Sequence, residues 1–299
     1  CAPVRHGVAV TSVGVQTRID GYLRDGIMVR KTTTAVVKTY NKNAREHIHE
    51  ILRTYLDDAG VVEYTETLLA CVDELIKNAV KANYKYVLVK NELSSGMTRD
   101  ENGNKIMNGI DAERYRVSAD EILQGGEISA RVRQILDEES IYISISNRMR
   151  DEKRSYRDDE KRMITSLQKF MAVKREIQEG GISTVMKIER TPGDLMLTVN
   201  NTAPILDGDL ERIERKRCEH LECLREGREH DFFINNIDTS ESGFGLGYAV
   251  INSCLYGMGL DPGRCLSINP IPDTTVCLRL PIKEMQYAFS REVELEPAV

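Results

Sequence analysis

Apolar residues recur every three or four positions from Tyr64 to Asn83, a spacing that predicts a helix with one apolar face. Glu74, Asn78 and Lys81 follow each other one turn apart and form a polar stripe on that helix. The same periodicity predicts further helices over 44–59, 119–138, 157–178, 209–226 and 248–256. Asn41 or Asn43 can cap the first of these, and Gly60 is expected to stop it.

Short runs that alternate in polarity or are rich in β-branched residues predict strands. These runs cover 32–37, 84–89, 141–146, 195–199, 265–269 and 275–280. Residues 1–29 are expected to form an N-terminal arm or an added strand, and 286–299 a C-terminal tail. An Asn-Gly turn predicts a hairpin over 98–106, and the whole stretch 91–193 differs enough in character to be expected as an insertion.

The composition is that of an ordinary globular protein, with 41% hydrophobic and 29% charged residues. A net charge of −6 argues against nucleic acid or an anionic membrane as the main partner. No apolar run is long enough to span a bilayer. The seven cysteines are an odd number and are scattered along the chain, which favours a reducing, cytoplasmic setting.

A glycine-rich segment, Gly243-Phe244-Gly245-Leu246-Gly247, immediately precedes an apolar helix. Glycines let backbone amides turn toward an anion, and the start of a helix adds the positive end of its dipole. Phosphate is the expected ligand. The segment lacks the Gly-Lys-Ser/Thr ending of a Walker loop and the context of a dinucleotide-binding fingerprint.

A predicted strand ends in two amide side chains and a turn, in the run from Val199 to Ile205. Asn200 and Asn201 could offer fixed hydrogen-bond partners, for example a carbonyl that accepts from an exocyclic amine. Ordinary turn residues at the end of a strand are the competing interpretation.

Taken in order, these segments resemble the GHKL superfamily of ATPases, which includes gyrase, the Hsp90 chaperones, histidine kinases and mismatch-repair ATPases. Glu74-x-x-x-Asn78 is similar to the N box, 199–205 to the G1 box and 243–247 to the G2 box. Residues 274–281 resemble the last, threonine-bearing strand of those domains. The resemblance implies an α/β (α+β) Bergerat fold, a two-layer sandwich of a mostly antiparallel sheet with helices on one face. It covers one domain over 30–285, interrupted by the insertion.

The resemblance also implies ATP and Mg²⁺ as cofactors and a role for each matching residue. Asn78 would hold the metal ion, Glu74 would orient or deprotonate the attacking group, and Lys81 would meet phosphate charge. Asn200 and Thr275 would contact adenine. The phosphates would be lined by Gly243, Gly245, Leu246 and Gly247, and 206–242 would form a lid over the nucleotide.

Two positions depart from the family pattern. Asn200 stands where the family has an aspartate, and Thr202 stands where it has a glycine and is expected to crowd the base. Ser144-Ile145-Ser146-Asn147 is a second candidate for the G1 box, since it too is predicted to end a strand in asparagine.

Glu74 resembles the glutamate of the hydrolysing members and of the anti-sigma-factor-type serine kinases, since many histidine kinases have an asparagine at this position. The short lead-in is similar to that of the serine kinases, and the layout also resembles sensor-kinase ATPase domains. The resemblance implies transfer of the γ-phosphoryl group to a partner protein. An ATP-hydrolysing conformational switch and a binding module without nucleotide are the alternatives. The sequence does not decide whether the chain forms a homodimer. His49 lies in a run similar to a phosphoacceptor box but is too close to Glu74 for that role. A zinc site at Cys218, His220 and Cys223 would require a broken helix.

Overall fold

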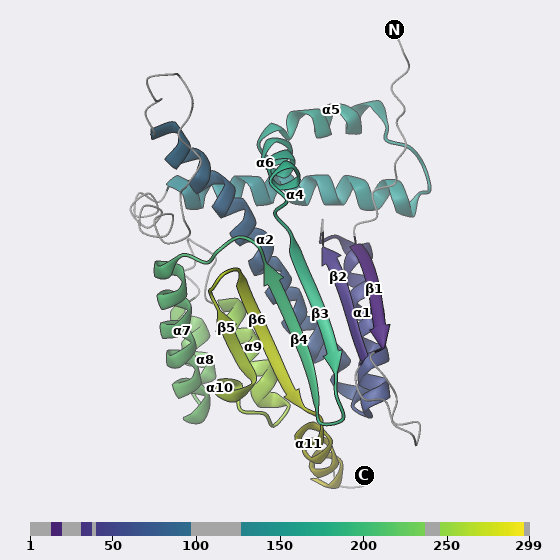
Figure 1. Cartoon of the computed structure of the whole chain (residues 1–299), viewed down its shortest axis with the longest axis vertical. Coiled ribbons are helices and arrows are strands. Elements are labelled where there is room, and N and C mark those ends of the chain that lie inside the picture. The colour runs from purple at the N-terminus through teal and green to yellow at the C-terminus, as the bar shows by residue number, and fades with distance from the viewer. Residues whose placement is uncertain (1–12, 20–30, 38–39, 97–126, 237–245, 296–299) are drawn as a thin grey trace.

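The structure is a computed structural model, and it describes residues 13–19, 31–37, 40–96, 127–236 and 246–295 (Figure 1). The described chain is of the α+β class and is built on one antiparallel sheet of six strands in the order β1-β2-β3-β4-β6-β5. The strands are β1 (Val13–Ile19), β2 (Lys31–Val37), β3 (Thr184–Arg190), β4 (Asp194–Asn201), β5 (Leu266–Asn269) and β6 (Thr274–Pro281).

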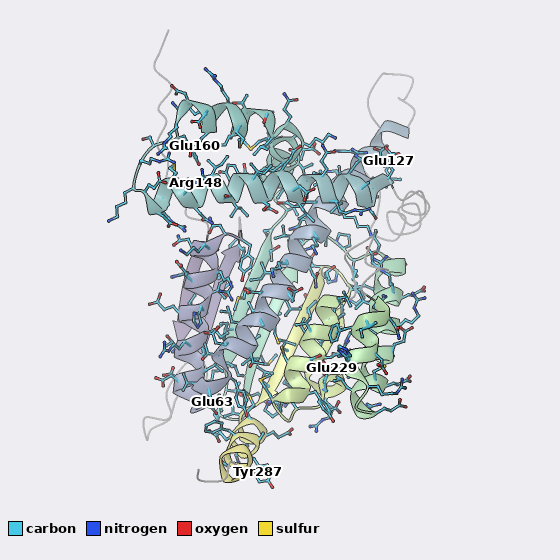
Figure 2. The ribbon with its side chains drawn as sticks, turned by 180° about the vertical axis from the view of Figure 1, so that it is seen from behind. Glu63, Glu127, Arg148, Glu160, Glu229 and Tyr287 are labelled. Carbon is cyan, nitrogen blue, oxygen red and sulfur yellow. The ribbon has the colours of Figure 1, made fainter. Side chains whose placement is uncertain are left out.

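Helices α1, α2 and α9 lie side by side behind this sheet and form the second layer of the molecule (Figure 1), and Figure 2 shows this layer from the other side. The helices and the short 3₁₀ turn η1 are α1 (Lys42–Ala59), η1 (Val62–Tyr64), α2 (Thr65–Gly96), α4 (Glu127–Asp151), α5 (Asp158–Ser166), α6 (Gln168–Glu179), α7 (Asp207–Arg225), α8 (Glu229–Asn236), α9 (Leu246–Gly257), α10 (Pro262–Cys265) and α11 (Ile282–Leu295).

The predicted boundaries of α1 are confirmed by its caps. The side chain of Asn41 accepts a hydrogen bond from the backbone N–H of Ala44, and so satisfies one of the free amides of the first turn. Gly60 ends the helix in the left-handed region, at φ 69°, where glycine is favoured because it lacks a Cβ.

The main core lies between the sheet and the helices. Along β4 every second side chain is buried, from Leu195 through Leu197 and Val199 to Asn201, whereas the residues between them are only half-buried. The buried side chains pack against fully buried apolar residues of the helices, such as Leu68, Val72 and Ile76 of α2. One face of the sheet is thus covered by helices, as the alternation along the strands requires.

A second, smaller core lies at the other end of α2. There α4 crosses the helix, and Glu127 and Arg148 mark the two end regions of α4 in Figure 2. Val87, Leu88 and Val89 of α2 pack against apolar residues of α4 and α6, of which Phe170 is the largest buried side chain. Among the residues that the structure describes, those that form this core belong to helices and turns.

Two sequence-based strand predictions are wrong. Residues 84–89 continue α2, and residues 141–146 lie within α4. Both runs are rich in tyrosine, valine and isoleucine, which favour strands. In the folded chain these side chains meet other helices instead, and packing overrides the local preference. The second candidate for the G1 box, 144–147, is therefore helical and does not end a strand.

Other differences concern elements that the sequence did not reveal. β3 lies within the stretch expected as an insertion, yet it pairs with both β2 and β4 in the middle of the sheet. The expected helix over 157–178 is divided at Leu167 into α5 and α6. Part of the expected C-terminal tail belongs to α11. The predicted hairpin at 98–106 lies outside the described residues. Within the described ranges, no helix has the length and apolarity to cross a membrane.

Candidate functional site

The polar stripe on α2 faces the beginning of α9. Glu74 and Asn78 are half-buried, and the Glu74 carboxylate accepts from Lys77 through its Oε1 atom, at 3.0 Å from Nζ. The other carboxylate oxygen points toward Gly247 in the first turn of α9. A Cβ built on Gly247 would lie 2.7 Å from Glu74 Oε2 and 3.0 Å from Asn78 Nδ2. A side chain at this position would have to displace both polar groups, so glycine permits the close approach of α9 to α2.

The structure therefore brings together two segments that are about 170 positions apart in the sequence. Leu246 and Gly247 are described and open α9, whereas Gly243 and Gly245 lie outside the described residues. Lys81 is half-buried one turn beyond Asn78, and it is not among the residues that line the cavity described next.

A mainly apolar cavity opens beside this contact, between α2 and the ends of β4 and β6. Its free volume is about 50 Å³. Apolar walls come from α2, β4, β6, the turn at 204–206 and α7. The lining residues with polar groups are Asn78, Lys85, Tyr86, Asn201, Asp209, Tyr248 and Thr274. Burial raises the pKa of Tyr248 to about 12, so its phenol is neutral at physiological pH.

The cavity is lined one residue away from each of the two positions predicted to contact adenine. Asn201 and Thr274 line the cavity, whereas Asn200 and Thr275 do not. Asn200 pairs with Thr275 across the strands and donates to its hydroxyl at 2.9 Å, on the face of the sheet away from the helices. Successive side chains of a strand point to opposite faces of the sheet. Shifting the alignment of the motif by one residue therefore selects side chains on the opposite face.

Asn201 is held in place by two hydrogen bonds. Its Nδ2 donates to the backbone carbonyl of Ala79 at 3.3 Å, and its Oδ1 accepts from the Thr184 hydroxyl at 3.4 Å. Thr274 donates to the carbonyl of Ala203 at 2.9 Å. The cavity thus presents an ordered amide and an ordered hydroxyl at the end of the sheet.

Thr202 does not crowd this cavity. Its hydroxyl accepts from the backbone N–H of Ser183 at 3.0 Å, beside the start of β3, and it is not a lining residue. The Thr202 side chain ties the turn after β4 to the turn before β3, so it does not narrow this cavity.

An ion pair that the sequence did not reveal closes the cavity on its far side. Lys85 of α2 and Asp209 of α7 form a hydrogen-bonded salt bridge, with 9% and 11% of the two side chains exposed. Arg212 also contacts the Asp209 carboxylate. The two partners are 124 positions apart in the chain. Each lies on a helix with an ordinary pattern of apolar residues, so neither helix by itself predicts the pair.

The alternative zinc site is not formed among the residues that the structure describes. α7 is continuous through Cys218, His220 and Cys223, and no cluster of three or more His, Cys, Asp or Glu side chains suited to a metal occurs in the described part of the chain. His220 is fully buried against the rings of Phe232 and Phe233. His49 contacts Glu66 at 3.1 Å on the outer side of α1 and α2.

The side chains beside Gly247 fit a Mg²⁺ ion that would also coordinate phosphate. Mg²⁺ takes oxygen ligands, commonly one or two from protein with the remainder from water and phosphate. Glu74 supplies a carboxylate at this point, and the amide oxygen of Asn78 lies 3.7 Å from the position of a Cβ built on Gly247. Neither family models, nor curated proteins, nor solved structures gave a match to this chain.

Proposed function

We propose that this chain binds Mg-ATP through a Bergerat-type fold and transfers the γ-phosphoryl group to a partner protein. The observation that carries the proposal is the contact of Gly247 with Glu74 and Asn78. It joins the polar stripe of α2 to the glycine-rich start of α9, at the rim of an apolar cavity. Metal, phosphate and base would then be accommodated by adjoining parts of one site.

The parts of the nucleotide are assigned by chemistry. The base fits the apolar cavity, where Asn201 and Thr274 provide the polar contacts. The phosphates fit the start of α9, because the first turn of a helix presents backbone N–H groups and the positive end of its dipole to an anion. Asn78 would hold Mg²⁺, which supplies charge neutralisation for the triphosphate when bound.

Glu74 is the candidate catalytic residue. Its carboxylate lies next to Gly247 and can accept a hydrogen bond from an attacking hydroxyl. Its bond to Lys77 holds one carboxylate oxygen and leaves the other directed at α9.

Nucleotide entry requires the cavity to widen. A free volume of about 50 Å³ corresponds to less than two water molecules at about 30 Å³ each, so a purine needs more room. The Lys85–Asp209 pair joins α7 to α2 across this space. Opening of α7 would enlarge the cavity, and the measured affinity would be reduced by the cost of that opening.

Calorimetric titration of the chain with Mg-ATP tests the proposal. Asn78→Ala should weaken binding at least tenfold, equivalent to about 1.4 kcal/mol. Glu74→Gln should preserve binding and abolish turnover, because it keeps the shape of the side chain and removes the base. Glu66→Gln removes an exposed carboxylate from the same helix and is the matched control.

The fate of a labelled γ-phosphoryl group tests the transfer step. Label on protein supports phosphoryl transfer, whereas label found only as inorganic phosphate would show hydrolysis and overturn that part of the proposal. Absence of Mg-ATP binding by the wild-type chain would overturn the whole proposal.

A further inference from the structure

A second cavity lies where α4 and α6 pack on α2 and on the start of β3. It has about 70 Å³ of free volume, so it is larger than the first cavity and comparable with two to three water molecules. Its walls include polar groups from four different elements, among them Asn83, Glu139, Lys174 and Ser183. A molecule of the size of glycine fits such a space.

One wall carries a buried hydrogen-bond acceptor with no partner, Asn83 Oδ1, in a residue that is only 5% exposed. The orientation of this amide follows from a chain of hydrogen bonds. The carbonyl of Ala79 can only accept, so Asn201 directs its NH₂ group there and its Oδ1 toward Thr184. The hydroxyl of Thr184 must then donate to Asn201 and accept from Asn83 Nδ2, at 3.2 Å.

The side-chain carbonyl of Asn83 is consequently left without a hydrogen-bond donor. Asn83 lines the second cavity. A buried acceptor without a donor lowers the stability of the folded chain. A ligand that brings an N–H group into the cavity would satisfy this acceptor.

The other polar walls carry opposite charges that are not paired with each other. Glu139 on α4 is 8% exposed, and burial raises its pKa while the Tyr84 hydroxyl and the nearby Lys174 lower it. Lys174 on α6 lies over the rings of Tyr142 and Phe170, at 4.4 and 5.2 Å from the ring centres.

Both side chains line the cavity, and no ion pair within 4.0 Å joins them. Glu139 is buried and Lys174 is half-buried, and their contacts with the Tyr84 hydroxyl and with the two rings offset only part of the cost of removing charge from water. A ligand that carries both charges would offset that cost at both walls.

We propose that this cavity binds a small zwitterion of the α-amino-acid type. The ammonium group would donate to Asn83 Oδ1 and to the Glu139 carboxylate, and the carboxylate of the ligand would face Lys174. The limited volume selects the smallest members of the class, with glycine as the probe. With five non-hydrogen atoms, such a ligand binds no more tightly than about micromolar.

Calorimetric titration of the nucleotide-free chain with glycine tests the proposal independently of any ATP site. Glycine should bind and raise the melting temperature, whereas acetate and methylammonium, which each carry one of the two charges, should bind at least tenfold more weakly. Glu139→Gln and Lys174→Met should each weaken glycine binding at least tenfold.

Exposed residues of α6 provide matched controls, because Arg175→Gln and Glu179→Gln remove the same charges outside the cavity. Both should bind glycine within twofold of the wild type. Circular dichroism verifies folding of each variant, and Glu139→Gln carries the test if Lys174→Met does not fold. No binding of glycine up to tens of millimolar, or equal binding of acetate or methylammonium, would overturn the proposal.

Discussion

The two halves of α2 contribute to two different cores. The first half packs between α1 and α9 against the sheet, and its buried face is almost wholly apolar, with Leu69 and Ile76 fully buried. The second half packs against α4 and α6 and meets the sheet through the bond from Asn83 to Thr184 of β3. Its surroundings include the buried polar residues Asn83, Lys85 and Glu139. The difference shows that one regular helix can support both an apolar core and a set of buried polar contacts.

The two regions are also joined by hydrogen bonds. Asn201 lines the first cavity, Asn83 and Thr184 line the second, and these three side chains are bonded in series. Such a chain fixes the amide orientations on both sides, because reversing one amide would leave its neighbour unsatisfied.

The largest expected effect tests how much the second core contributes to stability. Phe170→Ala should lower the free energy of unfolding by about 3–5 kcal/mol, since it removes a fully buried ring that contacts Tyr84 and Tyr142. Urea denaturation should retain one transition, because α2 runs through both cores. Met163→Ala, at a side chain that is 50% exposed, should change stability by less than about 0.5 kcal/mol.

A loss below about 1 kcal/mol for Phe170→Ala, or two separate transitions, would show that the second core is loosely attached.

A smaller effect on stability is expected from Asp73, a buried carboxylate in the first half of α2. Asp73 accepts hydrogen bonds from the Tyr40 hydroxyl and from Arg45, at 2.7 Å from Nε, and so ties α2 to the start of α1. Asp73→Ala should cost about 1–3 kcal/mol in denaturant unfolding, because it leaves the two partners without an acceptor while Arg45 can still reach water. Glu46→Ala, at an exposed pair with Lys42, should cost at most about 0.5 kcal/mol.

Equal effects of Asp73→Ala and Glu46→Ala would contradict this role for Asp73.

The smallest effect concerns pH and the packing of α7 on α8. Burial lowers the pKa of His220, and the carboxylate of Glu229 opposes this only in part. The unfolded chain then binds a proton below about pH 6.5 that the folded chain does not, so stability falls as the pH drops from 6.5 toward the folded-state pKa. The slope from this residue is at most about 1.4 kcal/mol per pH unit.

His220→Phe should flatten the dependence of unfolding free energy on pH in this range. An unchanged slope between this variant and the wild type would show that His220 does not titrate differently on folding.

Sequence patterns predicted the first region better than the second for a physical reason. The face of α2 and the strands β4 and β6 follow simple periods, and a glycine-rich segment directly before an apolar helix predicts a close approach of the backbone to an anion. The strand-favouring runs at 84–89 and 141–146 have no such constraint, and their helical state depends on contacts made at long range. The Lys85–Asp209 pair depends on distant elements in the same way.

The choice between Asn200 and Asn201 shows a second limit of prediction from sequence patterns. Both are asparagines at the end of a predicted strand, so composition cannot say which one faces the helices. The register is decided by the neighbouring strands, which bury Val199 and Asn201 together.

The affinity for Mg-ATP of Asn201→Ala, compared with Asn200→Ala, tests most directly whether the nucleotide lies on the helix-covered face of the sheet. We expect Asn201→Ala to weaken binding at least tenfold and Asn200→Ala to leave it within threefold of the wild type. Thr184→Val removes the hydroxyl that bonds Asn201 without altering the lining of the first cavity, and it serves as the control for indirect effects. Equal losses in Asn200→Ala and Asn201→Ala, or no loss in either, would contradict the account.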